Sequence, residues 1–156
     1  IVRTFIAQPF LVNGASMEKT FRNNDYLLVD ELTYRFREPL RGEVVVFKYP
    51  GDKTSFYIKR IIGLPGETIV IQNQTVKVYG KDFETMLSEP YIIKSSKNEK
   101  IQVTLENNQY FVMGDNRDFS FDSRSWGPLE ESKIIGIVRL RLWPINKAMA
   151  FSHPNY

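Results

Sequence analysis

The chain of 156 residues contains no cysteine and only one histidine, His153. Without thiols it can form no disulfide, thiolate metal site or cysteine nucleophile. A single histidine, placed in the polar tail over residues 151–156, argues against a Ser-His-Asp triad and against a multi-histidine metal site. If this chain is a hydrolase, another type of side chain must therefore act as its base.

Long apolar runs and clustered charge are also missing. The sequence has no run of about 18 apolar residues, so no part of it is expected to span a bilayer. Its formal charge of +3 comes from scattered lysines and arginines, whereas nucleic-acid-binding proteins gather theirs on one face. We therefore predict no nucleic-acid partner, although a mildly basic surface also suits an anionic lipid surface.

Helical patterns are rare, whereas short β-branched runs between turn residues are frequent. This pattern predicts one mainly antiparallel β domain, with or without a small insertion. We expect an extended or edge segment around Pro9, a loop-rich stretch over 81–100, and short helical turns near Glu130–Ser132 and after Pro144. The predicted strands are 26–30, 42–49, 55–62, the hairpin 68–71 and 75–79, the pair 101–105 and 109–113, and 134–142.

Two adjacent cations, Lys59 and Arg60, lie within the strand expected over 55–62. Neighbouring residues of a strand point to opposite faces, so the two side chains serve different purposes. Arg60 stays charged and requires a carboxylate or water, whereas Lys59 can lose its proton where its surroundings are dry. Because Lys59 shares a face with Tyr57 and Ile61, it is a candidate general base.

A lysine base needs a nucleophile, and Ser16 is the natural candidate. It follows Gly14 and Ala15 in a cluster of small residues, where the Ser16 N–H is able to help hold an oxyanion. Ser/Lys dyads are a known variant of the triad. The lysine pKa must then fall from about 10.4 toward neutrality. Taken alone, however, a serine beside a glycine is more often an ordinary turn.

The segment Met113–Arg124 is rich in carboxylates, arginines and hydroxyls. Asp115 is placed to pair with Arg60 across strands, and Asp122 is placed to pair with Arg124. Ser120 is able to exchange a hydrogen bond with the lysine amine. By composition alone, such a loop is more often simply solvated.

Three segments stand out: GASMEKT over 14–20, YIKRIIGLPG over 57–66, and GDNR through DSR over 114–124. Together they resemble the signature boxes of bacterial type I signal (leader) peptidases. They occur in the family's order, and the resemblance extends over most of the chain except about 80–105. It implies a catalytic β core over 1–70 and 106–150, a smaller inserted β region over 71–105, and a tail over 151–156.

The resemblance also implies a role for each matching residue. Ser16 would be the nucleophile, Lys59 the general base, and Ser120 would orient the Lys59 amine. The remaining assignments are the oxyanion site (Gly14, Ser16), the walls of the substrate cleft (Met17, with Tyr57 and Ile58) and the structural ion pairs (Arg60, Asp115, Asp122, Arg124).

The family's substrates are preproteins, which it cuts through an acyl-enzyme after small residues of the Ala-x-Ala type. It works without a metal or cofactor on the outer face of the cytoplasmic membrane. An N-terminal transmembrane anchor would then precede Ile1, and the membrane surface would be a second partner.

Two positions depart from the family pattern. Lys19 stands where proline is usual, which alters the turn after the nucleophile. Gly14 stands where some members have a serine whose hydroxyl completes the oxyanion hole. The second donor is then the Gly14 N–H, or it is missing.

Two other classes of protein remain open at this point. A LexA-type self-cleaving protein has a similar dyad and core, but its scissile Ala-Gly or Cys-Gly bond should precede the serine, and none is found before Ser16. A non-catalytic β module that binds extended peptides by strand addition would not need Lys59. The aromatic residues Phe119, Phe121, Trp126 and Trp143 suit a structural core, or a bilayer interface as the alternative.

Overall fold

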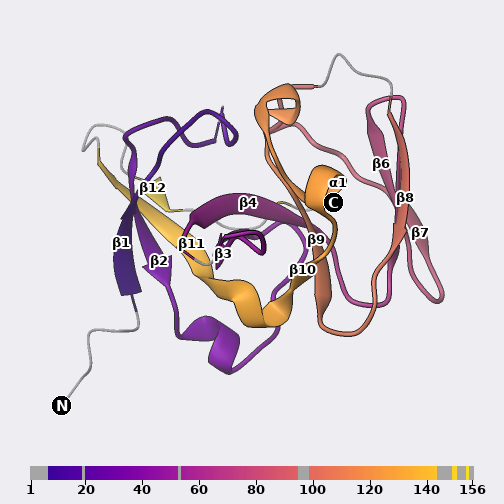
Figure 1. Ribbon diagram of the computed structural model, residues 1–156, viewed down its shortest axis with the longest axis horizontal. Helices are drawn as coiled ribbons and strands as arrows, with labels where there is room; N and C mark the ends of the chain where they lie inside the picture. Colours follow the sequence, from indigo (N-terminus) through magenta and orange to yellow (C-terminus); the bar gives the residue numbers. More distant parts are fainter. Residues whose placement is uncertain are drawn as a thin grey trace.

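The computed structural model describes residues 7–18, 20–52, 54–94, 99–143, 149–150 and 154. These residues form two antiparallel sheets that lie next to each other (Figure 1). The larger, eight-stranded sheet has the order β1-β2-β11-β3-β4-β9-β10, with β12 paired to β11, and the four-stranded sheet has the order β7-β6-β5-β8. The mainly antiparallel β fold is therefore confirmed.

The strands of the larger sheet are β1 (Ala7–Leu11), β2 (Tyr26–Asp30), β3 (Val44–Lys48), β4 (Phe56–Gly63), β9 (Gln109–Met113), β10 (Leu129–Glu130), β11 (Ile134–Trp143) and β12 (Met149–Ala150). Those of the smaller sheet are β5 (Thr68–Gln72), β6 (Thr75–Tyr79), β7 (Glu84–Met86) and β8 (Lys100–Thr104). The smaller sheet thus begins at Thr68, whereas the inserted region was expected over 71–105. Among the described residues, helical structure is limited to α1 (Ser123–Trp126) and the 3-10 turns Thr33–Arg35, Arg117–Phe119 and Glu131–Lys133.

Local turn chemistry explains the strands that the sequence predicted well. The β5–β6 hairpin turns through Asn73 and Gln74, whose φ values of 51° and 65° suit a tight two-residue turn. Pro9 lies in β1, which is an edge strand, where the absence of an N–H does least harm. The helical turn expected near Glu130–Ser132 appears as the 3-10 turn Glu131–Lys133, whereas the turn expected after Pro144 lies outside the described residues.

The predicted pairing of 101–105 with 109–113 is wrong. β8 pairs with β5, whereas β9 pairs with β4 in the other sheet. Leu105 explains the difference, because its side chain is buried between the sheets and its backbone exchanges hydrogen bonds with Gly66 and Glu67. The chain therefore crosses between sheets at 106–108 instead of folding back as a hairpin. Strand β7 was also missed, within the stretch predicted to be loop-rich.

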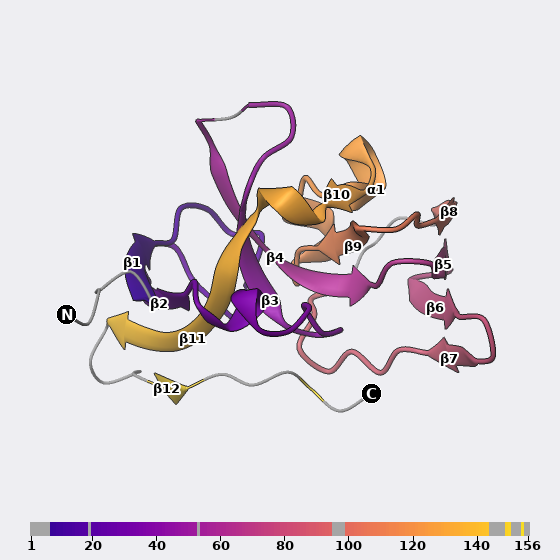
Figure 2. The same cartoon turned by 90° about the horizontal axis from the view of Figure 1, so that it is seen from below.

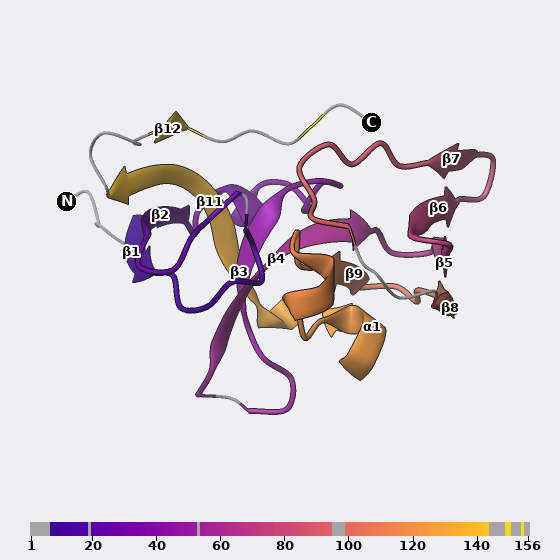
Figure 3. The same ribbon diagram turned by 90° about the horizontal axis from the view of Figure 1, so that it is seen from above.

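The two sheets share a hydrophobic core. Ile62, Phe111 and Met113 of the larger sheet pack in one buried cluster with Ile69 and Val78 of the smaller one. The hairpin joining β3 to β4 projects away from this body (Figures 2 and 3). Strand β4 lies inside the larger sheet, between β3 and β9, and carries both cations, so the candidate site forms beside it (Figure 1).

Candidate active site

Ser16 lies in the turn that follows β1, and its neighbour Met17 anchors that turn. Met17 is 2% exposed and Phe21 is fully buried, both in a cluster with Val12 and Leu27. The Phe21 N–H donates to the Met17 carbonyl at 2.8 Å, which closes the turn. With the next side chain held in the core, Ser16 is left at the surface of the cleft.

The Lys59 amine reaches Ser16 from strand β4. Lys59 Nζ lies 2.8 Å from Ser16 Oγ, within hydrogen-bond range, and the lysine is only 5% exposed. Burial lowers the pKa of Lys59 from 10.5 to about 8; Asp122 and Asp115 partly oppose this effect, and Arg124 adds to it. A neutral amine at this distance can accept the hydroxyl proton as the oxygen attacks.

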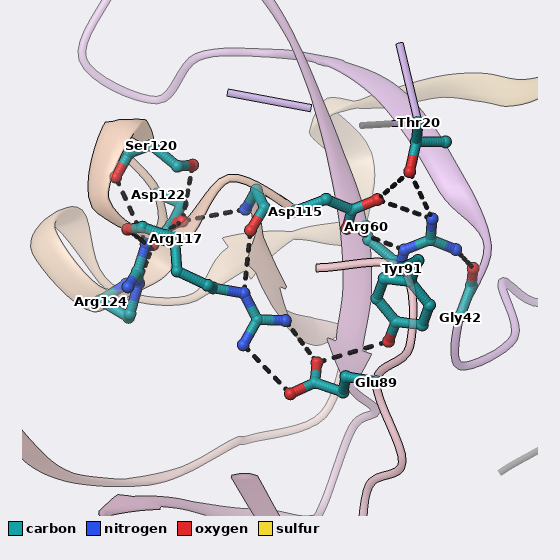
Figure 4. A network of polar contacts seen from close by, with 11 residues as sticks. Thr20, Gly42, Arg60, Glu89, Tyr91, Asp115, Arg117, Ser120, Asp122 and Arg124 are labelled. Carbon is teal, nitrogen blue, oxygen red and sulfur yellow. Dashed lines mark hydrogen bonds and ion pairs between the residues drawn. The ribbon is translucent and has the colours of Figure 1, made fainter. Parts of the chain in front are cut away.

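Arg60 points away from the dyad and holds Asp115. Its Nε and Nη2 donate to the two oxygens of Asp115 at 3.0 and 2.8 Å, and its Nη1 donates to the Gly42 carbonyl at 2.8 Å. Thr20 donates a further bond to Asp115 at 2.5 Å (Figure 4). Asp115 is fully buried, so this set of donors compensates its charge, and the two cations do different work as the strand alternation predicted.

Asp122 organises the other end of the loop. Fully buried, it pairs with Arg124 through Nε and Nη2, both at 2.9 Å, and accepts the Arg124 N–H as the N-cap of α1. It also accepts the Gly114 N–H at 3.0 Å and the Ser120 hydroxyl at 2.7 Å. The loop from 114 to 124 is therefore folded around one carboxylate.

Ser120 is placed differently from the role that the resemblance implied. Its hydroxyl donates to Asp122, and no hydrogen bond joins it to Lys59 among the described residues. It does lie close to the nucleophile turn: a Cβ on Gly114 would fall 2.1 Å from Ser120 Oγ and 2.6 Å from the Ser16 carbonyl oxygen. Glycine is needed at 114 because these two residues meet there.

Gly14 also differs from the expected oxyanion donor. Its N–H donates to the Asn23 side chain at 2.9 Å, and its φ of 97° favours glycine. By contrast, the part of the chain that the structure describes offers no protein acceptor for the Ser16 N–H. Lys19, the other departure from the family pattern, lies outside the described residues.

Asn116 is a site residue to which the sequence reasoning gave no role. Its N–H donates to the Ser16 carbonyl at 2.8 Å, and its Nδ2 donates to the Ala15 carbonyl at 3.0 Å. The 114–124 segment thus holds the backbone of the 14–20 segment through these two hydrogen bonds. The only sequence signal was the place of Asn116 inside that motif.

A cleft of about 570 Å³ opens onto the dyad. Its walls include Met17, Tyr57 and Ile58, the three residues assigned to it from the sequence. Two strand edges border it: β1, which pairs only with β2 in the described structure, and Phe56–Lys59 of β4, which there pairs only with β3. An extended peptide can add to such an edge.

Exposed apolar side chains surround the mouth of this cleft. Phe119 is 75% exposed, and Phe56, Phe121 and Leu11 are each about half exposed. The expectation that Phe119 and Phe121 belong to the core is therefore wrong, although the Phe121 ring contacts Tyr49 at 5.8 Å. Trp126 does pack against the core, and the side chain of Trp143 is outside the described residues.

Within the described ranges, the acidic residues form no group suited to a metal ion. No helix in the same ranges is both long and apolar enough to cross a bilayer.

The comparisons with known proteins agree with one another. Residues 1–143 match the family described as signal peptidase, peptidase S26. The chain is 40% identical over 150 residues to the probable signal peptidase I-2 of Synechocystis sp.. The matched region covers 92% of this chain and 66% of that relative, just under two thirds of the relative's length. It is 32% identical over 165 residues to signal peptidase IB of Staphylococcus aureus, covering 94% and 83% of the two chains.

A crystal structure of a signal peptidase I from Enterococcus faecalis V583 matches with a TM-score of 0.56 and 29% sequence identity, over 65% of this chain and 97% of that one. The fold and these relatives define the class as a serine endopeptidase. The chain belongs to the signal peptidase family, peptidase S26, whose members remove signal peptides. This confirms the resemblance and favours a peptidase over both the LexA-type protein and the non-catalytic module.

Proposed function

We propose that this chain cleaves signal peptides from preproteins with Ser16 as nucleophile and Lys59 as general base. The observation that carries the proposal is the 2.8 Å contact between Lys59 Nζ and Ser16 Oγ, made by a lysine whose pKa is lowered to about 8. Burying a lysine amine beside a serine hydroxyl costs free energy, because burial disfavours the charged form. A purely structural role would not require a lysine at this position.

The proposed reaction has two stages. Ser16 Oγ attacks the scissile carbonyl while Lys59 Nζ takes its proton, and the Ser16 N–H donates to the oxyanion. The protonated amine then gives that proton to the leaving nitrogen, which releases the mature protein and leaves the signal peptide as an ester on Ser16. Water, deprotonated by Lys59, hydrolyses the ester. No metal or cofactor enters this scheme.

Substrate binding is proposed to occur by strand addition along the cleft edges. The edges of β1 and of Phe56–Lys59 that have no partner strand in the described structure supply backbone groups to an extended segment. Met17 and Ile58 wall the cleft with bulky side chains, which favours small substrate residues near the scissile bond, as in Ala-x-Ala sites.

We further propose that the mouth of the cleft rests on the outer surface of the cytoplasmic membrane, with an anchor N-terminal to Ile1. The exposed Phe119, Phe121 and Leu11 support this proposal, because apolar side chains gathered at one rim suit the bilayer interface. Flotation with anionic vesicles at low salt tests it. Binding that falls in the Phe119→Ser/Phe121→Ser variant is expected, and no binding by the parent chain would count against it.

The central test is cleavage of a preprotein with an Ala-x-Ala junction in detergent, with mass spectrometry of the new N-terminus. We expect one cut after the second Ala and none with Ser16→Ala. A cut elsewhere would refute the specificity, and persistent cleavage by Ser16→Ala would refute the nucleophile.

A further inference from the structure

The segment Leu87–Lys94, between β7 and β8, leaves the smaller sheet and lies along the third motif. Leu87 and Ile92 are buried, which ties the segment to the core. The Ile93 N–H donates to the Asp115 carbonyl at 2.8 Å, and the Arg117 N–H donates to the Ile93 carbonyl at 3.1 Å, so that Ile93 and Asn116 form a parallel bridge. This part of the inserted region is therefore built into the loop beside the dyad.

Glu89 holds the same loop through Arg117. Both nitrogens at the end of the guanidinium contact the carboxylate, one at 3.1 Å, and both side chains are more than nine-tenths buried. The remaining donor, Arg117 Nε, donates to the Gly114 carbonyl at 2.9 Å. Because a bidentate pair fixes the plane of the guanidinium, Glu89 sets how the turn from 114 to 117 is closed.

The same turn holds the nucleophile. Asn116 lies inside it and donates to the carbonyls of Ser16 and Ala15. A shift of the turn therefore moves the backbone that carries Ser16 Oγ. Glu89 is thus connected to Ser16 through Arg117 and Asn116, beside the backbone bonds that Ile93 makes to the same turn.

Tyr91 makes a second connection, to the strand of the base. Its ring lies 3.9 Å from the Arg60 guanidinium carbon, and its hydroxyl donates to Glu89 at 3.3 Å (Figure 4). Arg60 adjoins Lys59 in β4. One short segment thus touches the supports of both the nucleophile and the base.

We propose that Glu89 and Tyr91 are positioning residues, through which the inserted region holds Ser16 and Lys59 at reacting distance. The proposal rests on the Ser/Lys mechanism proposed above. Neither residue lines the cleft, so their loss should lower kcat and leave KM nearly unchanged.

The chain offers a matched control in Glu67. It forms a bidentate pair with Arg41 at 2.7 and 2.6 Å, it is nearly as buried as Glu89, and it also lies where the two sheets meet. In the described structure it makes no hydrogen bond to the 114–117 turn. Glu67→Gln therefore reproduces the loss of a buried ion pair without disturbing the nucleophile.

Kinetics on an Ala-x-Ala peptide separate the two variants. Glu89→Gln should lower kcat about tenfold or more with KM within about twofold, because small misplacements of reacting groups are costly. Glu67→Gln should leave kcat at the value of the parent, although it should lower thermal stability about as much as Glu89→Gln does. Tyr91→Leu should lower kcat more than Tyr91→Phe, which keeps the ring over Arg60. Equal kcat in the two glutamine variants would overturn the proposal.

Hydrogen exchange supplies a readout that does not depend on activity. The Asn116 N–H donates to Ser16, so its protection should fall in Glu89→Gln and stay unchanged in Glu67→Gln. Unchanged protection in both variants would overturn the positioning role even if the parent is active. An inactive parent would refute the proposed function instead, while the exchange result would still decide whether Glu89 holds the nucleophile turn.

Discussion

Replacing Lys59 with methionine should abolish cleavage and yet stabilise the protein at neutral pH. Lowering the pKa of Lys59 from 10.5 to about 8 means that protonation of the folded state at pH 7 costs about 3 kcal/mol relative to the unfolded chain. The variant loses the hydrogen bond to Ser16, a contribution of about 1 kcal/mol. Methionine fills a similar buried volume, so a net gain of about 2 kcal/mol is expected.

The pH dependence of this gain identifies its cause. Because the folded pKa lies below the unfolded one, the unfolded chain holds an extra proton between pH 8 and 10.5, and the stability of the parent rises with pH in that window. The advantage of Lys59→Met should therefore be largest at and below pH 7 and should disappear near pH 10.5. Titrating groups elsewhere contribute equally to the stability of both proteins, so their contributions cancel in the stability difference between the parent and Lys59→Met.

Urea unfolding followed by fluorescence, at pH 7, 9 and 10.5 for both proteins, measures this difference. Lys59→Gln is the matched control, since it keeps a polar group in the site without a titrating charge. A stability difference that stays constant with pH would refute the buried, weakly basic lysine. A variant less stable than the parent at pH 7 would refute it as well.

Three further outcomes follow from the site. Ser16→Ala should keep the fold and lower kcat at least about 10⁴-fold, measured with the Ala-x-Ala peptide and circular dichroism. Gly114→Ala should lower kcat sharply, because the added Cβ would fall 2.6 Å from the Ser16 carbonyl oxygen. The control Gly66→Ala, where the φ is 83° and the space around the Cβ is open, should cost only about 1–2 kcal/mol of stability. Equal activity in the two variants would contradict the close approach at Gly114. Arg60→Met should lower the free energy of unfolding, measured in urea, by about 3–5 kcal/mol, since it leaves Asp115 buried without its ion-pair partner. Adding Asp115→Asn should recover part of this loss. Additive losses in the double variant would argue against the pair.

The features that the sequence predicted are those set by local chemistry. The strands over 26–30 and 75–79 agree with the structure because turn residues bound short alternating runs, and the strand over 109–113 agrees because turn residues precede a short apolar run. The sequence offered Asp115 as a partner for Arg60 across strands, and the structure makes this pair because Asp115 closely follows β9, which pairs with β4.

The features that were missed depend on contacts distant in sequence. Nothing local in 106–108 shows that the chain changes sheets there, because that choice is made by the burial of Leu105. Glu89 lies in a polar stretch without periodicity, and only its contact with Arg117 gives it a role. The engagement of the Gly14 N–H by Asn23 is likewise a tertiary detail that no motif encodes.

The most direct measurement of the central claim is kcat/KM for an Ala-x-Ala peptide as a function of pH, in parallel for the parent, Ser16→Ala and Lys59→Met. A base with a pKa of about 8 predicts activity that rises through that pH and levels off above it, and no activity in either variant. Retained activity in Lys59→Met, or a parent profile that is flat from pH 6 to 10, would contradict the assignment of Lys59 as the base.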